Sequence, residues 1–352
     1  MGQRLQLKRY LIGIYAFLVL GVSVFLVVHL IDGRDMPAIY DDKDAPSEVD
    51  HKQSPKTIDE DTQKILSEMR RRVTIQLPAG IGSKPPKETG RTGLGGAQAA
   101  DIKVDQGRSG DHKIEKGWRT HVSPLQPKTD KPKLIIVIDD LGLDQQASRR
   151  LAGLTGPFTL AYLPYADDLP FQTALVKDAG HELLVHLPME PMNKQADPGY
   201  NAMLSGLTDA EFEKRLQWNL SRFDGFIGVN NHMGSRMTAD GPSMARVLGQ
   251  LHAQDYVFLD SLTTNKSYGR VLSRRLDVPF MARDIFLDNN RDKDAILEQL
   301  NKAIRIANQR GYAIAIGHPY QETLDILEYL SENRDQLPYE LAPLSALFLQ
   351  ME

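Results

Sequence analysis

An alternation of short apolar runs with amphipathic segments occupies the second half of the chain and restricts its fold more than any other feature. The first run, residues 134–138, is continuous and rich in β-branched side chains, which is typical of a parallel strand buried on both faces. Further runs of this kind occur at residues 158–163, 182–187, 226–230, 256–260, 278–282 and 312–316. The pattern predicts an α/β domain with a distorted (β/α) barrel of about seven parallel strands, and an open doubly wound sheet is the alternative.

Helical patterns separate several of these runs, at residues 208–222, 243–254, 294–310 and 321–330. The first begins at Thr208 with Glu211 at the third helical position, which is the arrangement of a capping box. The third ends before Gly311, where a C-cap is expected. These signals mark helix ends and support the alternation of strands with helices.

An uncharged apolar stretch near the N-terminus predicts a membrane anchor. Residues 11–31 contain no Asp, Glu, Lys or Arg, and a helix of this length spans a hydrocarbon core of about 30 Å. Basic residues precede the stretch and aspartates follow it, which predicts that residues 1–10 stay in the cytoplasm. We therefore expect a single-pass protein of a bacterial inner membrane with its C-terminal domain in the periplasm or outside. A cleaved signal peptide is the alternative.

Composition divides the rest of the chain and excludes several functions. Residues 32–130 lack a sustained apolar period and predict a flexible, disordered tether, so that the folded domain is expected at residues 131–352. The chain has no cysteine, which excludes disulfides, thiolate ligands and a cysteine nucleophile. A net charge of -4 argues against nucleic acid as a partner.

Ionisable and amide side chains follow the predicted strands at one end. In parallel β/α folds the functional sites gather at the carboxyl ends of the strands. The strand ends carry Asp139 and Asp140, His186, Asn231 and His232, Asp260, Asp284, and His318. A random surface would scatter such groups over both ends of the strands, so this clustering is the strongest functional signal in the sequence.

Three of these side chains form a candidate metal site. Asp140, His186 and His232 offer a carboxylate oxygen and two imidazole nitrogens, which suits a divalent ion such as zinc and leaves positions for water and substrate. The ion would lower the pKa of its bound water and polarise a carbonyl. Asp139 would then act as general base and His318 as general acid.

Four short motifs resemble those of the divergent branch of the polysaccharide deacetylases. They are residues 138–142 (IDDLG), 186–190 (HLPME), 230–235 (NNHMGS) and 316–319 (IGHP), and the resemblance covers most of residues 131–350. It implies a distorted β/α barrel and metal-assisted removal of acetyl groups from sugars. By position in the motifs, Asp139 corresponds to the base, Asp140 and His186 to metal ligands and His318 to the acid.

The chain departs from the ordinary deacetylases at two ligand positions. Those proteins carry a second metal histidine, or an aspartate, four residues after the first, where this chain has Glu190. Their fourth-strand motif supplies an arginine, where this chain has His232. We therefore expect His232 to bind the metal, with Glu190 as a further ligand or as a support for the ligands. Asn231, Asp260 and Asp284 are candidate supporting or substrate-binding residues.

Two functions from different classes follow from these observations. The first is a metal-dependent hydrolase, expected to use zinc, that removes acetyl groups from an envelope glycan such as peptidoglycan. The second is a deacetylase-like barrel that has lost turnover and binds glycan or an envelope protein. The changed ligand positions favour the second, and the expected tether, which would let an anchored domain search the envelope, favours the first.

Overall fold

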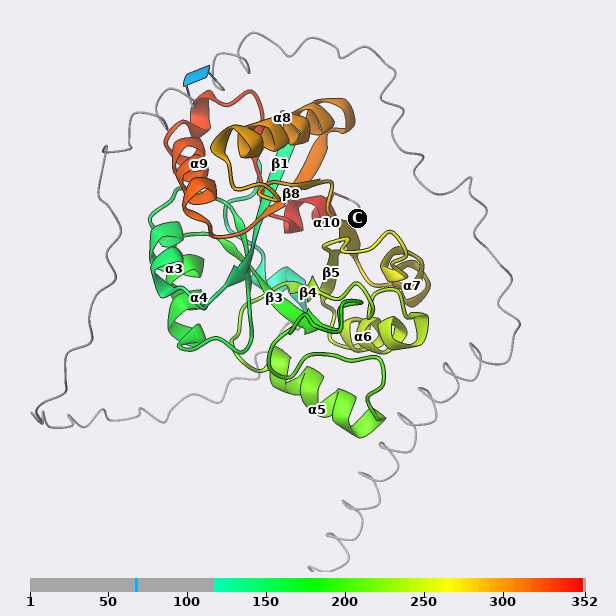
Figure 1. Cartoon of the computed structure of the whole chain (residues 1–352). Coiled ribbons are helices and arrows are strands. Elements are labelled where there is room, and N and C mark those ends of the chain that lie inside the picture. The colour runs from blue at the N-terminus through cyan, green and yellow to red at the C-terminus, as the bar shows by residue number, and fades with distance from the viewer. Residues whose placement is uncertain (1–66, 69–116, 351–352) are drawn as a thin grey trace, which may run out of the picture. The chain divides into compact units, whose positions relative to one another are not determined.

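The computed structural model describes residues 67–68 and 117–350, and Figure 1 shows the arrangement of its elements. Contacts divide the chain into residues 1–58 and 59–352, and the fold below belongs to the second unit. The strands are β1 (Lys133–Leu141), β2 (Thr159–Tyr162), β3 (Glu182–Met189), β4 (Gly228–Met233), β5 (Val257–Asp260), β6 (Phe280–Ala282), β7 (Ile285–Phe286), β8 (Tyr312–Gly317) and β9 (Glu340–Leu341). The helices are η1 (Trp118–His121), α3 (Gln145–Ala152), α4 (Leu169–Asp178), α5 (Asp209–Leu220), α6 (Gly241–Ala253), α7 (Gly269–Leu276), α8 (Lys293–Arg310), α9 (Gln321–Glu332), η2 (Arg334–Gln336) and α10 (Ser345–Leu349).

The strands form one parallel sheet whose two edges are close together in the sequence. The strand order is β6-β5-β4-β3-β2-β1-β8-β7, and β9 pairs with β1. Only two residues separate the edge strands β6 and β7. Arg283 N donates to Asp260 O at the end of β5, whereas Asp284 N donates to Ile314 O in β8. The sheet therefore curls like a barrel, and the expected parallel α/β fold is confirmed in place of the open doubly wound sheet.

The two faces of the sheet bury different sets of side chains. Along β1, Leu134 and Ile136 pack outward into the core beneath the helices, whereas Ile135 and Val137 point to the inner face. This alternation is the ordinary period of two in a strand. Figure 1 shows helices α3 to α9 arranged around the sheet. Leu347 and Phe348 of α10 join the inner cluster and close the interior at the amino ends of the strands.

The folded domain begins earlier than the expected boundary at residue 131. Trp118 is buried, and its ring meets that of Phe348 edge-on, with 5.7 Å between the centroids. Ser123 Oγ donates to Gly180 O at 2.7 Å, and the carboxylate of Glu340 accepts a 2.8 Å bond from Lys128 N. Residues 117–130 are thus a strap on the domain and not part of a tether. The strap has few apolar residues and no period, so the sequence pattern did not indicate it.

Three expected parts of the chain lie outside the described residues. They are the basic stub at residues 1–10, the anchor at residues 11–31, and residues 32–66 and 69–116 of the tether. Ser67 and Glu68 are helical. Among residues 67–68 and 117–350, no helix combines the length and the apolar character that crossing a membrane requires.

Candidate metal centre

The end of β1 carries two consecutive aspartates that both reach the same site. Asp139 continues the inward alternation of the strand and is buried. Asp140 has a φ of 57°, in the left-handed region that side chains other than glycine rarely adopt. The register between β1 and β2 shifts between Ile138 and Leu141, which places an irregularity around Asp140. Consecutive residues of a regular strand point to opposite faces, so this irregularity is what brings both carboxylates to one site.

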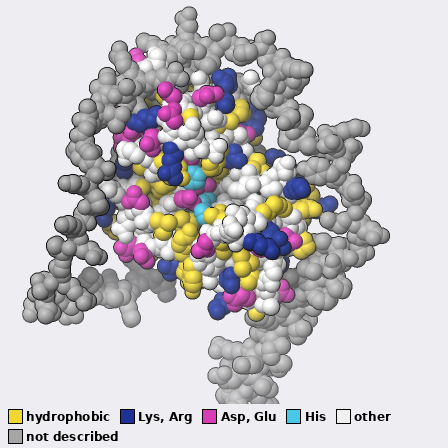
Figure 2. Space-filling view, viewed as in Figure 1, with side chains coloured by type: hydrophobic (Ala, Val, Ile, Leu, Met, Phe, Trp, Pro, Cys, Tyr) yellow, Lys and Arg dark blue, Asp and Glu magenta, His cyan; other side chains and the backbone are white. Residues whose placement is uncertain are grey.

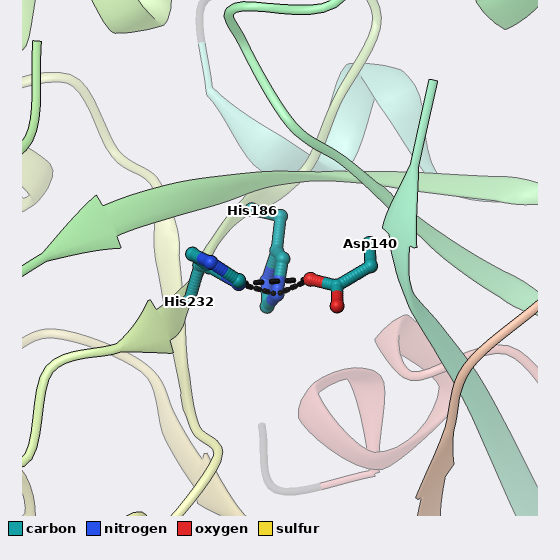
Figure 3. Close-up of side chains that lie close together, drawn as sticks. All are labelled: Asp140, His186 and His232. Atoms are coloured by element: carbon teal, nitrogen blue, oxygen red, sulfur yellow. Dashed lines mark hydrogen bonds and ion pairs between the residues drawn. The ribbon is translucent and has the colours of Figure 1, made fainter. Parts of the chain in front are cut away.

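Asp140, His186 and His232 converge from the ends of β1, β3 and β4 (Figure 3). Asp140 Oδ1 lies 2.8 Å from His232 Nδ1 and 3.1 Å from His186 Nε2. The two imidazole nitrogens are 3.2 Å apart. The strands β3 and β4 are hydrogen-bonded neighbours, and His186 pairs with Asn230 in their register. His232 comes two residues after Asn230, so its side chain lies on the same face of the sheet. The predicted convergence of the three residues is confirmed.

The three atoms fit a tetrahedral ion. Ligands that surround zinc at about 2.0–2.1 Å lie about 3.3 Å from one another, close to the three distances in this site. Asp140 Oδ1 is also buried, and its close contacts in the part of the chain that the structure describes are the two imidazole nitrogens of His186 and His232. A buried carboxylate oxygen that faces two imidazole nitrogens suits a shared cation, because a charge in the interior needs a partner. Asp140, His186 and His232 would hold the ion and leave a fourth position open.

Asn230 orients one metal ligand and the neighbouring carboxylate. His186 Nδ1 donates to Asn230 Oδ1 at 2.9 Å, which leaves the lone pair of His186 Nε2 directed to the centre. Asn230 Nδ2 donates to Asp139 Oδ1 at 2.7 Å. Partners of this kind fix the tautomer and the ring orientation of a ligand. Asn230 was not among the predicted site residues. Its place next to Asn231 in the motif of residues 230–235 is the sequence signal that could have indicated it.

His318 approaches the centre from the end of β8. Its Nδ1 donates to Asp288 Oδ1 at 2.9 Å, and its Nε2 lies 3.7 Å from Asp140 Oδ2. Asp288 is buried, and its second oxygen accepts bonds from His318 N and Thr323 Oγ1. Burial opposes protonation of His318, but the bond to Asp288 outweighs it and raises the pKa of the imidazole. Asp288 also escaped prediction, because it lies in a loop between two elements rather than at the end of a predicted strand.

The charges in the centre are strongly coupled. Burial opposes ionisation of Asp140, but the bonds and charges of His186 and His232 outweigh burial and lower its pKa. Burial opposes protonation of His186, but Asp139 and Asp140 raise its pKa to about 9. Burial raises the pKa of Asp139. The two carboxylates thus favour positive charge at this point, which is the charge that a bound cation would supply.

A pocket of about 660 Å³ opens above the centre. Figure 2 shows histidine side chains within a hollow on this face. The Arg283 guanidinium lies on one wall, where it donates to the carbonyl oxygens of Ser261 and Leu262. Phe286 lies beside His318, with 5.2 Å between the ring centroids. The pocket thus extends from the metal ligands toward the junction of β6 and β7.

Glu190 does not take the position that we expected for it. Its Oε2 accepts bonds from Ser205 N at 2.8 Å and from Ser205 Oγ at 2.6 Å, and its Oε1 lies 3.1 Å from Arg236 Nε. It is absent from the group of side chains that converge on the metal position. The expectation that Glu190 binds or supports the metal is therefore wrong, because Ser205 and Arg236 hold its carboxylate in the loop that follows β3.

The remaining expected residues have structural roles around the site. Asn231 Oδ1 accepts a bond from Ser261 N, which joins β4 to the loop after β5 at the pocket wall. Asp260 accepts bonds from Leu262 N and Ser267 Oγ within that loop and does not line the pocket. Asp284 lines the pocket, but Ile314 N and Arg310 hold its carboxylate.

The fold and the site together define a class of protein, a parallel α/β barrel with a candidate metal centre at the carboxyl ends of its strands. A family model described as "Divergent polysaccharide deacetylase" matches residues 136–348, and the chain belongs to this family. The resemblance of the four motifs is therefore confirmed.

Relatives and a solved structure agree with this assignment. The chain is 31% identical over 211 residues to the uncharacterized protein YibQ of Escherichia coli (strain K12), a match that covers 60% of this chain and 64% of YibQ. It is 32% identical over 198 residues to an uncharacterized protein of Haemophilus influenzae, covering 56% and 70% of the two chains. The crystal structure of the uncharacterized protein ATU2773 from Agrobacterium tumefaciens has a TM-score of 0.63 at 24% identity and covers 65% of this chain and 94% of that one, which shows a shared fold.

Proposed function

We propose that the domain is a metal-dependent hydrolase that removes acetyl groups from an envelope glycan such as peptidoglycan, with zinc as its ion. The observation that carries the proposal is the position of two ionisable side chains next to the ligands. Asp139 Oδ2 lies 3.7 Å from His186 Nε2, and His318 Nε2 lies 3.7 Å from Asp140 Oδ2. The family description supports a polysaccharide as the substrate.

The chain's own residues suit both proton transfers of such a reaction. An ion held by three protein ligands would lower the pKa of water and polarise the acetyl carbonyl. Asp139, oriented by Asn230, accepts the proton of the attacking water. His318, oriented by Asp288, donates a proton to the departing nitrogen or oxygen of the sugar. The C–N or C–O bond breaks, and the products are acetate and the free amine or hydroxyl.

The test is the release of acetate by the zinc-loaded full chain from N-acetylglucosamine oligomers and from their O-acetylated forms. Asp139→Asn should keep the metal and lower turnover by roughly 10²–10⁴, since it removes a proton acceptor without touching the ligands. A wild-type chain that holds zinc and binds the oligomers, yet releases no acetate from either form, would rule out the hydrolase. That result would favour the binding module instead.

We also propose that residues 11–31 anchor the chain in the inner membrane with the domain on the outer side. The support is the uncharged stretch with basic residues before it and acidic residues after it. Alkaline phosphatase, which folds only outside the cytoplasm, should be active when it is fused after residue 352. An inactive phosphatase together with an active cytoplasmic reporter at the same position would reverse the orientation.

A further inference from the structure

The loop that follows β3 is the longest loop at the end of the sheet that holds the metal centre, and it displays an exposed aromatic ring. The loop spans residues 190–208, between β3 and α5. Its Tyr200 is 65% exposed, more than any other large hydrophobic residue in the described part of the chain. Long loops within compact domains are commonly functional. An exposed ring in this loop is therefore a candidate contact for substrate.

Tyr200 rests on a second aromatic side chain. Its ring meets the half-buried ring of Trp218 edge-on, with 5.1 Å between the centroids and 80° between the planes. The guanidinium of Arg222 lies 4.9 Å from the centre of the Trp218 ring, and its Nε donates to Pro164 O. We name Tyr200 and Trp218 the aromatic ledge. Trp218 thus supports Tyr200 at the surface of the domain.

The backbone on both sides of Tyr200 is fixed. Asn219 Nδ2 donates to Asn201 O at 3.0 Å, and Arg215 Nη1 donates to Ala202 O at 2.9 Å. Gly199 N donates to Asp197 Oδ1 at 2.9 Å. The exposed ring is therefore held in place before any ligand arrives, and preorganisation lowers the entropy cost of binding.

Glu190 fastens the same loop at its base. Its carboxylate binds Ser205 and Arg236, and its backbone N–H donates to Met203 O. The carboxylate that the sequence suggested as a metal ligand thus anchors the loop that carries the ledge.

The loop that carries the ledge packs on Tyr165, at the end of the sheet that holds the metal centre. Gly199 has a φ of 93°, and a Cβ at this position would collide with the Tyr165 ring, so the loop packs directly on Tyr165. Tyr165 comes just after β2, which lies between β1 and β3 in the sheet, so it is at the end of the sheet that holds Asp140 and His186. The pocket extends from the centre toward β6 and β7, whereas the ledge lies in the loop that follows β3.

We propose that the aromatic ledge is a subsite where one sugar ring of an extended glycan stacks on Tyr200 while another sugar unit of the same chain lies at the metal centre. An aromatic ring presents a flat apolar face, and the Tyr hydroxyl adds a polar edge, which together suit a sugar. The proposal rests on the proposed function only for the class of ligand, a glycan. It adds the place where a second sugar unit of that glycan binds.

Tryptophan emission of the full chain tests the ledge. The sequence has two tryptophans, and Trp118 is buried at the closed end of the barrel whereas Trp218 lies in the ledge. A β-1,4-linked N-acetylglucosamine hexamer should change the emission saturably, and the monomer at equal concentration should not. Trp218→Phe, which keeps a ring beneath Tyr200, should abolish the change. No change with the hexamer in the wild-type chain overturns the proposal.

Matched variants separate the ledge from a general apolar surface. Tyr200→Ala should weaken hexamer binding roughly tenfold, whereas Tyr200→Phe should stay within about twofold. Phe171→Ala is the control, because Phe171 is an exposed ring at the start of α4, 55% exposed, and lies outside the loop. Equal weakening by Tyr200→Ala and Phe171→Ala would instead indicate an apolar docking surface, such as a protein would use, and would overturn the proposal.

Failure of the ledge and failure of the hydrolase give different results. His186→Ala, which removes a metal ligand, should still show the emission change with the hexamer. If it does and the wild-type chain releases no acetate, the ledge stands and the hydrolase fails. If the wild-type chain releases acetate, and Tyr200→Ala has unchanged kcat/KM on every oligomer length, the hydrolase stands and the ledge fails.

Discussion

Asn230 couples His186 to Asp139 through the two ends of one amide. Its oxygen accepts from His186 Nδ1 at 2.9 Å, and its nitrogen donates to Asp139 Oδ1 at 2.7 Å. The same side chain therefore orients a candidate metal ligand and the candidate base. Because an amide has one acceptor end and one donor end, it also sets which ring nitrogen of His186 carries a proton.

Asn230→Ala should weaken metal binding about 10- to 100-fold, because His186 loses the partner that holds its tautomer and ring orientation. Competition with a chelator of known affinity measures the change. Asn308→Ala, the same substitution at an exposed position of α8, is the control and should leave the affinity unaltered. Unchanged affinity in both variants would mean that Asn230 does not support the ligand.

His232→Ala should abolish stoichiometric zinc binding, because it leaves Asp140 and His186 as the only ligands of the converging group. Glu190→Gln should keep one zinc per chain, since Ser205 and Arg236 hold that carboxylate away from the centre. Metal content of the two purified variants decides the matter. Loss of zinc from Glu190→Gln with retention in His232→Ala would contradict the assigned ligands.

Asp288→Asn should shift the alkaline limb of the pH–rate profile to lower pH. The pairing with Asp288 raises the pKa of His318, so the imidazole keeps its proton to a higher pH than a free histidine does. A general acid is active only while it is protonated, so removal of the negative charge lets activity fall at a lower pH. The acid limb should move less, and metal content should not change. An alkaline limb at its wild-type position would show that His318 is not the acid.

Trp118→Ala should lower the free energy of unfolding by about 3–5 kcal/mol, as truncation of a large buried ring commonly does. Trp118 is 1% exposed and packs against Phe348. Denaturant unfolding of the domain measures the loss. Leu349→Ala is the control. Leu349 follows Phe348 in the chain but is 40% exposed, so its truncation should lower the free energy of unfolding far less. If the Trp118→Ala variant is as stable as the wild type, residues 117–130 do not contribute to the folded domain.

Several parts of the fold could be predicted because local patterns carry them. Each of the seven expected apolar runs overlaps a strand of the sheet, and the Thr208 side chain caps α5 by accepting from Glu211 N. The sequence patterns did not predict helices α3, α4 and α7. They have only eight to ten residues each, so the apolar period is sampled for two or three turns. The short strand β9 depends entirely on its pairing with β1.

The position of the metal centre could be predicted because its candidate ligands lie at the ends of strands. Asp140, His186 and His232 end neighbouring or nearly neighbouring strands, so topology alone brings them together. The partners of these residues depend on side-chain directions that no local pattern contains. Glu190 lies only four residues after His186, yet the loop beyond it returns Ser205 to bind its carboxylate. Asp288 contacts His318 across thirty residues of chain.

The strap has a mechanical consequence for the domain. Trp118 N donates to Asp255 O just before β5, and Ser123 binds Gly180 just before β3, so the strap contacts the amino ends of the strands. The metal centre and the aromatic ledge are at the carboxyl ends. A force that pulls on the chain at Gly117 would therefore act on the packing of Trp118 against Phe348 and not on the candidate metal ligands. The side chains that converge on the candidate metal centre lie at the opposite end of the sheet from the strap.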